Sequence, residues 1–499
     1  LADVAYSLRM GRHEFDQRRV LGCSTLAEAA TLLENPEPRR VFTHTRELDK
    51  PSLVFMFPGG GAQYVRMGRG LYEAEPVFRQ HIDHGLSVLK SRFGADLAAV
   101  LFAAGEVGPE QDELLSRPSA QLPLTFLVEY ALTKLWEHHG VRPAAAIGHS
   151  MGENTAACIA GVFSFEDALG LLLIRGQLVE LTPPGGMLSV PMSAADLRPY
   201  LADGLDLASA NSPQLSVASG PVDLLKGLAE RLAATGVDTQ VVRVSVAGHS
   251  RLLDEILPRF RAYLKSIQLN APKFPVISNR TGKWLEASQA RDPEYWVSHL
   301  RNSILFSDGV QTLLEADDRV FLEVGPGNML GSFVRQHPGS PTQRVISSMR
   351  HVNDPVSDHV YFRGVLARLW AVGVGFDIEK LWPGVRNRVP LPTYAFQHAR
   401  YWVEPTVGAD LSAQDVTMPE RIVRHEDWFF EPKWIQQGVL EQDDEPHVWL
   451  VFHSGEPVAA GVIAEAAVLA IVDAVMGFAV DMLQTGKRLA QIKNLTTAS

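Results

Sequence analysis

The stretch AAAIGHSMG, residues 144–152, decides the fold of this chain. An apolar β segment runs directly into the pattern Gly-x-Ser-x-Gly, which is typical of a sharp turn between a strand and a helix. In such a turn the glycines avoid clashes, the serine hydroxyl stands clear of the sheet, and the next main-chain N–H points at a developing oxyanion. Glu153 follows near the positive end of the expected helix. We therefore predict that Ser150 is a nucleophile; a strand-to-helix turn without chemistry is the alternative.

A second strand ends in a glycine turn further upstream. The apolar run LVFMF, residues 53–57, is followed by Pro58 and three glycines. Strands that alternate with helical segments, such as residues 122–139, predict an α/β fold with a largely parallel sheet. The turn lacks the Gly-Lys-Ser/Thr ending of a phosphate-binding loop, so nucleotide binding is not expected. Its glycines would instead let the main chain approach a ligand, to which Gln63 could donate its N–H.

The pattern of expected strands and helices changes between about residues 183 and 246. Short β segments at residues 187–190, 215–218 and 240–244 surround a helical segment at residues 221–234. This arrangement predicts a small α+β subdomain inserted into the α/β fold. The α/β pattern then resumes in two apolar segments, FPVISN (274–279) and VFLEVGPG (320–327).

A nucleophilic serine needs a base, and His249 is the candidate. It follows an extended apolar run and precedes a helical segment, so it lies at a strand end or in a loop, where catalytic groups are often placed. A structural role is the alternative. None of the aspartates between Ser150 and His249 is privileged as an acid partner; among them are Asp167, Asp203, Asp206, Asp223 and Asp238.

Arg175 lies in the helical segment FEDALGLLLIRGQLVEL, for which Ser164 is the expected N-cap. Counting by three and four along this helix places Arg175 in a row of apolar residues. A buried guanidinium must be paired, and its planar fork matches a carboxylate. Two partners remain open: an aspartate or glutamate of the protein itself, or the carboxylate of a substrate.

Composition narrows the functional classes. The chain has 499 residues with 46 Lys and Arg against 57 Asp and Glu, a net charge of −11, which argues against nucleic acid as the principal ligand. Two cysteines give no disulfide framework and no Cys-rich metal site, which suits a reducing cytoplasm. The apolar stretch 461–483 is interrupted by three carboxylates, so we expect a buried helix there and no membrane span. Because the chain starts without methionine, we expect it to be a piece of a longer protein.

Together these motifs strongly resemble the acyltransferase domain of modular polyketide synthases and, more distantly, the malonyl-CoA:acyl carrier protein transacylases. The motifs that carry the resemblance are FPGGGAQ (57–63), GHSMGE (148–153), Arg175, GHS (248–250), SNRTG (278–282), DPEYWVSHLR (292–301) and FLEVGPG (321–327). The resemblance implies an α/β-hydrolase-like large subdomain with a parallel sheet, a small ferredoxin-like α+β subdomain, and flanking α/β linker modules.

The resemblance also divides the chain. Residues 1–48 resemble part of the linker between a ketosynthase and its acyltransferase, and residues 49–340 the acyltransferase domain, with the small subdomain at about 183–246. Residues 341–405, which end in LPTYAFQHARYW, resemble the linker after the acyltransferase. Residues 406–499 include DWFFEPKW and resemble the start of a following domain, such as the structural subdomain of a ketoreductase.

The family's roles transfer to single positions. Ser150 matches the nucleophile, His249 the general base, and Arg175 the clamp for the free carboxylate of the extender unit. The oxyanion hole matches the main-chain N–H groups of Met151 and Gln63. A main-chain carbonyl at His299 would orient the base, which would explain why no acid stands out. The expected pocket residues are Gln121, His149, Asn211, Val246 and Gly248.

The implied reaction moves a malonyl-type unit from acyl-CoA, through an acyl-serine, to the phosphopantetheine thiol of an acyl carrier protein. No metal and no bound cofactor are expected, and neither nucleic acid nor a membrane is an expected partner. The expected partners are acyl-CoA, the carrier protein, and the adjacent ketosynthase and other domains of the same polypeptide. A serine hydrolase or thioesterase of the α/β-hydrolase type is the alternative; it leaves Arg175 and the linkers unexplained.

Departures from the family pattern bear on the extender unit. Gly60 stands where the family's F-P-G-Q-G has glutamine. The tetrapeptide that ends at His249 reads Val-Ala-Gly-His, where malonyl-selective members have His-Ala-Phe-His and methylmalonyl-selective ones Tyr-Ala-Ser-His. Gly248 lacks the bulk that would exclude an α-branch, which favours methylmalonyl. Ser119-Ala120-Gln121 instead resembles the malonyl type, and Met151 is not the glutamine of methylmalonyl sites.

Overall fold

The structure is a computed structural model that describes residues 1–393, except residues 39, 103–107, 202–203, 243, 245 and 382–383. These residues belong to one unit, Leu1–Ala395. The predicted further domain at 406–499, its apolar stretch 461–483 and most of LPTYAFQHARYW lie outside the described residues.

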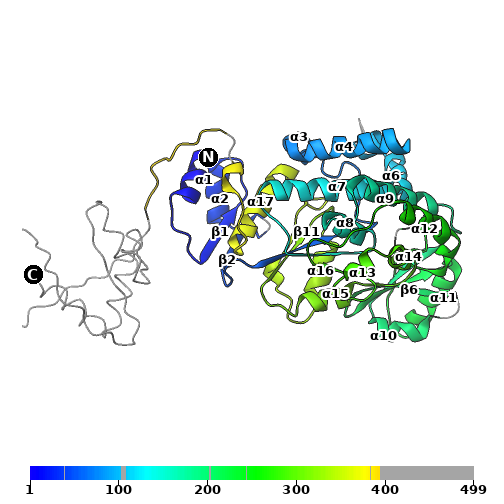
Figure 1. Cartoon of the computed structure of the whole chain (residues 1–499). Helices are drawn as coiled ribbons and strands as arrows, with labels where there is room; N and C mark the ends of the chain where they lie inside the picture. The colour runs from blue at the N-terminus through cyan, green and yellow to red at the C-terminus, as the bar shows by residue number, and fades with distance from the viewer. Residues whose placement is uncertain are drawn as a thin grey trace, which may run out of the picture. The chain divides into compact units, whose positions relative to one another are not determined.

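A five-stranded parallel sheet forms the centre of the large subdomain (Figure 1). Its strands, in spatial order, are β12 (Val345–Ser347), β11 (Arg319–Glu323), β3 (Ser52–Phe57), β4 (Ala145–Gly148) and β9 (Val276–Ile277). Each neighbouring pair runs parallel. The predicted α/β class with a parallel sheet is therefore confirmed.

Both faces of this sheet are buried, as parallel sheets require. Successive residues of β3 point to opposite faces: Phe55 and Phe57 belong to one apolar core, and Val54 and Met56 to another. The helices that contribute to the first core include α3 (Arg69–Ala74), α4 (Pro76–Phe93), α7 (Pro118–His138), α8 (Met151–Ile159), α9 (Phe165–Val179), α12 (Leu257–Ser266), α14 (Pro293–Arg301) and α17 (Asp358–Ala371). The helices of the second core are α15 (Phe306–Leu313) and α16 (Met329–Arg335).

The small subdomain holds a second five-stranded sheet. Its strands, in spatial order, are β10 (Ile304–Leu305), β6 (Asp206–Ser212), β7 (Leu215–Gly220), β5 (Gly186–Val190) and β8 (Gln240–Val241). The chain order β5, α10 (Ala194–Leu197), β6, β7, α11 (Val222–Ala233), β8 gives the ferredoxin-like arrangement, which confirms the predicted α+β class. Two strands were not predicted. β6 reads DLASANS and carries no apolar alternation, and β10 comes from the large subdomain's part of the chain.

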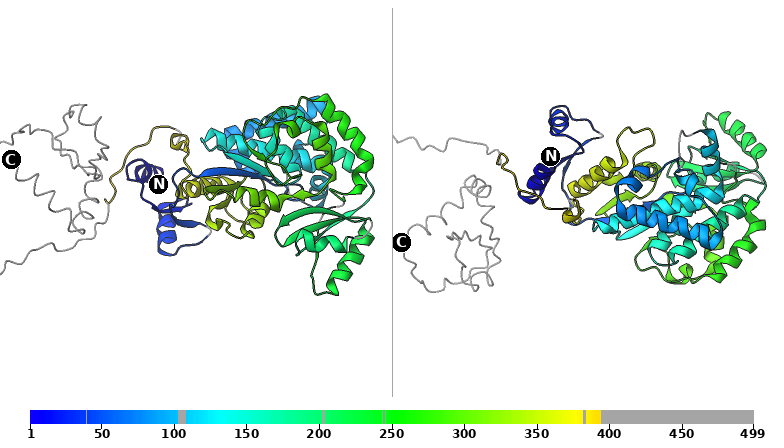
Figure 2. Two further views of the ribbon diagram at one scale, coloured as in Figure 1. Left: turned by 60° about the horizontal axis from the view of Figure 1, so that its bottom comes forward. Right: turned by 90° about the horizontal axis from the view of Figure 1, so that it is seen from above.

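The N-terminal residues form a separate small module. It contains α1 (Ala2–Met10), α2 (Leu26–Glu34) and an antiparallel pair, β1 (Gln17–Leu21) and β2 (Val41–Thr45). Helix α17 (Asp358–Ala371) packs against this pair, and Figure 2 shows this yellow segment beside the blue N-terminal module. It also contacts α3 of the large subdomain. The large sheet itself extends past residue 340, because β12 lies in the range that the sequence assigns to the second linker.

The remaining elements are short helices: α5 (Ala98–Leu101), α6 (Pro109–Ser116), α13 (Ala287–Ala290) and the 3₁₀ turns η1 (Arg198–Tyr200), η2 (Arg251–Ile256), η3 (Thr342–Arg344) and η4 (Ile378–Leu381). Among the described residues, no helix has both the length and the apolar character needed to cross a membrane.

Candidate active site

Ser150 sits at a sharp turn where β4 ends and α8 begins. Its main chain has φ 53° and ψ −118°, a left-handed conformation that side-chain-bearing residues adopt rarely. A Cβ on Gly148 would overlap the main chain of Gly152 and Glu153, and a Cβ on Gly152 would overlap the carbonyl oxygen of Phe57. Both glycines are therefore required by close packing of main chain against main chain, as the pattern predicts.

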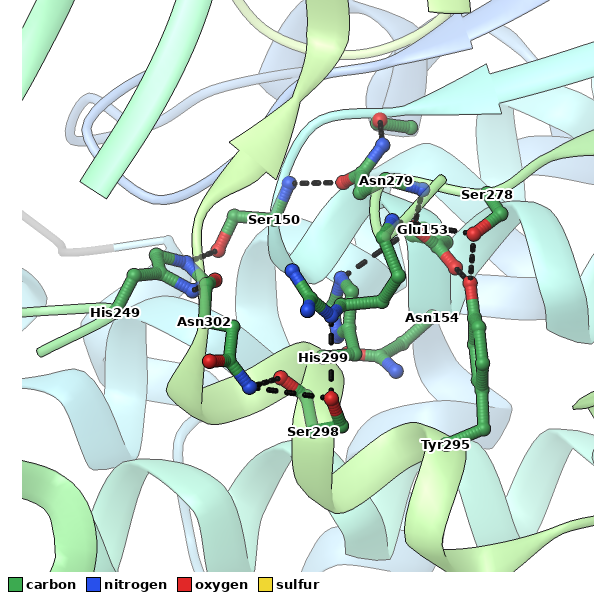
Figure 3. Close-up of polar contacts among 12 residues, drawn as sticks. Ser150, Glu153, Asn154, His249, Ser278, Asn279, Tyr295, Ser298, His299 and Asn302 are labelled. Carbon is green, nitrogen blue, oxygen red and sulfur yellow. Dashed lines mark hydrogen bonds and ion pairs between the residues drawn. The ribbon is translucent and has the colours of Figure 1, made fainter. Parts of the chain in front are cut away.

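The structure brings Ser150 and His249 together (Figure 3). The Oγ of Ser150 lies 2.7 Å from Nε2 of His249. On the other side of the ring, Nδ1 lies 3.1 Å from the main-chain oxygen of Asn302. A carbonyl only accepts, so Nδ1 carries the proton and Nε2 is left to accept from the serine hydroxyl. This is the tautomer that a general base needs.

The carbonyl that orients His249 differs from the one expected at His299. The hydrogen bond from Nδ1 reaches Asn302, the residue directly after α14, where carbonyls lack partners within the helix. The main chain of His299 acts on the ring as well, because both carbonyls raise the pKa of His249. The ring of His299 is buried, with Nε2 at 3.5 Å from Oε2 of Glu153.

Arg175 lies next to the same serine. Helix α9 begins after the predicted cap, since the Ser164 hydroxyl accepts from Asp167 N–H. The guanidinium is buried; Nη2 donates to Ser150 Oγ at 2.9 Å and Nη1 to Asn154 Oδ1 at 3.0 Å. Within the described part of the chain, no carboxylate lies within 4.0 Å of it. Of the two partners left open by the sequence, an ion pair inside the protein is therefore not found there.

Burial and this cation set the protonation of the base. Burial, followed by the charges of Arg175 and His149, lowers the pKa of His249 to about 3. The imidazole is thus neutral near pH 7 and able to accept a proton. Burial also lowers the pKa of Arg175 to about 10, while the charge of Glu153 opposes that shift, so the guanidinium stays cationic at neutral pH.

Glu153 is a buried acid in the first turn of α8, after Ser150. One oxygen accepts from the main-chain N–H of Asn279 at 2.6 Å, and the other accepts from the hydroxyl of Tyr295. Burial raises the pKa of this carboxyl to about 7, against the effect of those two donors. Glu153 does not reach Nδ1 of His249, so it does not complete a Ser-His-acid triad.

Two predicted pocket residues connect the subdomains. Nε2 of His149, in the turn after β4, lies 2.8 Å from Oδ1 of Asn211, which belongs to β6 of the small sheet.

Gly60 faces Gln121: a Cβ there would lie 3.4 Å from Oε1 of Gln121. The absence of a side chain at position 60 thus leaves room for the buried Gln121.

The remaining predicted site residues border the turn. Among the described residues, a Cβ on Gly248 would meet Sδ of Met187, at 3.8 Å, and no other atom within 4 Å outside its chain neighbours. Val246 is half-buried against the first core. The Met151 N–H begins α8, where the first N–H groups lack partners within the helix. Gln63 lies in the loop after β3, with its side-chain Oε1 accepting from Gly61 N–H at 2.8 Å.

Sequence reasoning missed three asparagines in this site. Asn154 holds Arg175, and its signal was available, because it lies one helical turn after Ser150. Asn279 holds the main chain of Ser150; it stands in the motif SNRTG, whose residues carry no predicted role. Asn302 acts through its carbonyl, and a main-chain acceptor leaves no mark in the residue type.

The fold and the site define a class of proteins: α/β proteins with a parallel sheet, a serine on the turn after a strand, and a histidine within hydrogen-bond distance of that serine. The chain belongs to the acyl transferase domain family, whose model matches residues 54–369. It is homologous to the acyl transferase domains of modular polyketide synthases, which confirms the resemblance drawn from the motifs.

The similar proteins include polyketide synthases and solved acyl transferase domains. The chain is 37% identical over 419 residues to a phenolphthiocerol/phthiocerol polyketide synthase of Mycobacterium tuberculosis, covering 81% of this chain and only 28% of that much longer protein. The acyl transferase domain of ZmaA has a TM-score of 0.72 at 35% identity, covering 79% of this chain and 91% of that one. The acyltransferase domain from the second module of the salinomycin polyketide synthase has a TM-score of 0.66 at 33% identity, covering 78% and 91%.

Proposed function

We propose that this chain loads a malonyl-type extender unit from acyl-CoA onto the phosphopantetheine thiol of an acyl carrier protein, through an acyl-serine at Ser150. We assign residues 49–340 to the catalytic domain, whose large sheet is completed by β12 beyond residue 340; we assign 1–48 and 341–405 to flanking linkers, and 406–499 to the start of a further domain. Within a cytoplasmic polyketide synthase, the neighbours of this chain would be a ketosynthase and other domains of the same polypeptide.

In the first half-reaction, His249 takes the proton of Ser150 as Oγ attacks the thioester carbonyl. The C–S bond then breaks, and the sulfur of coenzyme A leaves with the proton that His249 held. The main-chain N–H groups of Met151 and Gln63 stabilise the oxyanion, each worth about 10²–10³ in rate. In the second half, His249 takes the proton of the phosphopantetheine thiol, the sulfur attacks the serine ester, and Ser150 regains its proton.

The observation that carries this proposal is the position of Arg175. A buried cation in contact with Ser150 Oγ, with no carboxylate within 4.0 Å of it among the described residues, supports recognition of an acyl group that has a carboxylate of its own. A serine hydrolase or thioesterase is the second candidate and would use Ser150 and His249 in the same way. It is less well supported, since Nδ1 of His249 meets a carbonyl where such enzymes carry an acid.

For the extender unit, we infer methylmalonyl in preference to malonyl. The open space beside Gly248, bounded by Met187, supports room for an α-methyl group. An α-methyl difference in a pocket is worth only about 1–3 kcal/mol, so the preference is a matter of ratio.

Intact-protein mass spectrometry tests the function. The protein is incubated with malonyl-, methylmalonyl- or acetyl-CoA, and then with a holo acyl carrier protein. We expect a stable adduct from the two carboxylated thioesters, absent in Ser150→Ala, that moves to the carrier protein. Rapid hydrolysis with neither an adduct nor transfer would favour the hydrolase.

A further inference from the structure

One buried amide spans the turn that carries the nucleophile. Oδ1 of Asn279 accepts from the main-chain N–H of Ser150 at 3.0 Å, and Nδ2 donates to the carbonyl of Gly148 at 2.7 Å (Figure 3). Asn279 is fully buried and lies two residues beyond β9. Its side chain therefore closes a ring with the main chain on both sides of His149.

This turn needs such support. The left-handed conformation of Ser150 costs on the order of 1–3 kcal/mol, and it persists only where the surroundings determine it. Ser150 precedes the first residue of α8, so its N–H has no acceptor in the helix. A buried N–H without an acceptor would itself be destabilising. The amide oxygen of Asn279 supplies that acceptor.

Asn279 is in turn fixed by its own main chain. Its N–H donates to Oε2 of Glu153 at 2.6 Å, and its carbonyl accepts from Leu305 N–H at 2.8 Å. Glu153 also accepts from the Tyr295 hydroxyl, which comes from α14. The main chain of Asn279 is thus hydrogen-bonded to α8 on one side and to β10 on the other. These two bonds set the position of its side chain relative to the turn.

We propose that Asn279 is a positioning residue for the nucleophile: it holds the main chain of the turn so that Ser150 Oγ stays against His249 and Arg175. It acts through Ser150, since its two amide contacts are both to main chain. This inference rests on the nucleophilic role proposed for Ser150. It adds a hydrogen-bonded support to the glycine packing that shapes the turn.

The chemistry of the amide makes the proposal specific. Asparagine offers one acceptor and one donor, which match the N–H of Ser150 and the carbonyl of Gly148. An ionised aspartate offers acceptors only and would face that carbonyl with negative charge. A protonated aspartate again offers one donor and one acceptor. Asn279→Asp should therefore lose function in the ionised form and regain it on protonation.

The groups that face position 279 act on this titration. The nearby carboxyl of Glu153 and the low solvent access raise the pKa of an aspartate there, and the cations oppose that shift. The titratable and charged groups around the position are Glu153 of α8, Tyr295 and His299 of α14, Arg175 of α9, His149 and His249 beside the turn, and Arg280 of the same segment.

The experiment compares Asn279→Ala, Asn279→Asp and a matched control, Thr312→Val. Thr312 is buried, and its hydroxyl donates to the carbonyl of Gly282 at 2.6 Å in the same 278–282 segment, without contact to the turn. Quenched mass spectrometry measures the single-turnover rate of Ser150 acylation by methylmalonyl-CoA, and thermal melting measures stability. A second probe, phenylmethylsulfonyl fluoride, reports the reactivity of Oγ without a carboxylate or coenzyme A.

We expect Asn279→Ala to slow acylation about 100-fold, the size of effect that a misplaced reacting atom produces, with an apparent KM close to that of the wild type. Thr312→Val should keep the wild-type rate. The rate of Asn279→Asp, divided by that of the wild type at the same pH, should rise as the pH falls from 8 to 5. A purely structural role would lower the melting temperature of both asparagine variants without that pH-dependent ratio.

Three outcomes overturn the inference. They are a wild-type acylation rate in folded Asn279→Ala, a flat pH ratio in Asn279→Asp, and an equal slowing by Thr312→Val. If Asn279→Ala does not fold, the Asn279→Asp ratio decides. If the wild type reacts with the sulfonyl fluoride but not with acyl-CoA, the proposed function fails. The ratios of variant to wild-type rate, measured with the sulfonyl fluoride, then still test the role of Asn279. If neither reagent labels Ser150, both proposals fail.

Discussion

Nη2 of Arg175 donates to Oγ of Ser150 at 2.9 Å, on an atom that also lies 2.7 Å from the ring of His249. A buried cation therefore touches the atom to which an acyl group would be attached. The rest of its hydrogen bonding goes to a neutral amide, that of Asn154. A carboxylate two bonds from the reacting carbonyl would find this guanidinium within its reach.

Replacing Arg175 should change selectivity more than reactivity. In Arg175→Ala we expect kcat/KM for methylmalonyl-CoA to fall at least about 10-fold, since a charged hydrogen bond contributes about 1.5–3 kcal/mol. The value for acetyl-CoA should change much less. Arg175→Lys should not restore the wild type, because an ammonium lacks the planar fork. Equal losses on both thioesters would refute the clamp.

The low pKa of His249 predicts how the rate of Ser150 labelling depends on pH. With its pKa at about 3, the ring is neutral well below pH 6.5, so the second-order rate of Ser150 labelling by phenylmethylsulfonyl fluoride should not fall near that pH. Any change near pH 7 should come from Glu153, whose pKa is about 7, and should vanish in Glu153→Gln. A fall centred near pH 6.5 that persists in Glu153→Gln would contradict this assignment.

The same depressed pKa predicts acid sensitivity of the fold. A histidine held neutral favours the folded state above its ordinary pKa of about 6.5, and that contribution is lost as the pH falls toward its folded value. His139 adds to this effect. Burial lowers its pKa to about 4, against the charge of Glu75, while Arg363, His138 and Lys380 lower it further.

His139→Phe should therefore reduce the loss of stability on acidification. The ring is buried beside Phe362, at a centroid distance of 5.6 Å, and neither nitrogen has a hydrogen-bond partner among the described residues. Chemical denaturation at pH 7.5 and pH 5 measures the free energy of unfolding. We expect the difference between the two pH values to shrink in the variant; an unchanged difference would show that His139 does not titrate with unfolding.

Substitutions at Gly248 test whether this position lines the pocket that selects the extender unit. Gly248→Phe fills the space toward Met187, so incorporation of methylmalonyl should fall relative to malonyl by about 10–200-fold. A competition assay with both thioesters, read as the two acyl-serine masses, measures the ratio. Gly248→Ala, with a side chain that meets only Met187, should move it far less. An unchanged ratio in the phenylalanine variant would place the extender pocket elsewhere.

The glycines of the turn give a stability prediction. Gly152→Ala drives a Cβ into the carbonyl of Phe57, and we expect a loss of about 1–3 kcal/mol or more in the free energy of unfolding. Gly227→Ala is the matched control. It lies inside α11 with no atom within 4 Å of its Cβ position, so alanine should stabilise by about 0.5–1 kcal/mol. Similar melting temperatures for the two variants would contradict the packing argument.

Much of this architecture was accessible from sequence because its signals are local. The run LVFMF and the Gly-x-Ser-x-Gly pattern each combine an apolar strand with glycines that only a close turn requires, and β3 and β4 indeed pair side by side. β6 and β10 gave no such signal, since one is made of small polar residues and the other has two residues. Their strand character comes from the partners they find in three dimensions.

The site residues divide in the same way, into those with a local sequence signal and those defined by contacts in three dimensions. Ser150 stood out by its glycine pattern, His249 by its place after an apolar run, and Arg175 because a guanidinium in an apolar helix row needs a partner. The groups that contact Ser150 and His249 from loops are an amide at Asn279 and a carbonyl at Asn302, and neither residue type is unusual in a loop. Contacts with main chain depend on the path of the backbone, which a single sequence does not display.

The hydrogen bond between His149 and Asn211 has a mechanical consequence. It joins the residue beside the nucleophile to a strand of the other sheet, so the two sheets cannot separate without breaking it. If the sheets separated, water would replace the lost partner of each group, so the net cost is that of one hydrogen bond, about 0.5–1.5 kcal/mol. The hydrogen bond thus couples the two sheets next to Ser150: a movement of β6 away from β4 would have to break it or carry the His149 side chain along.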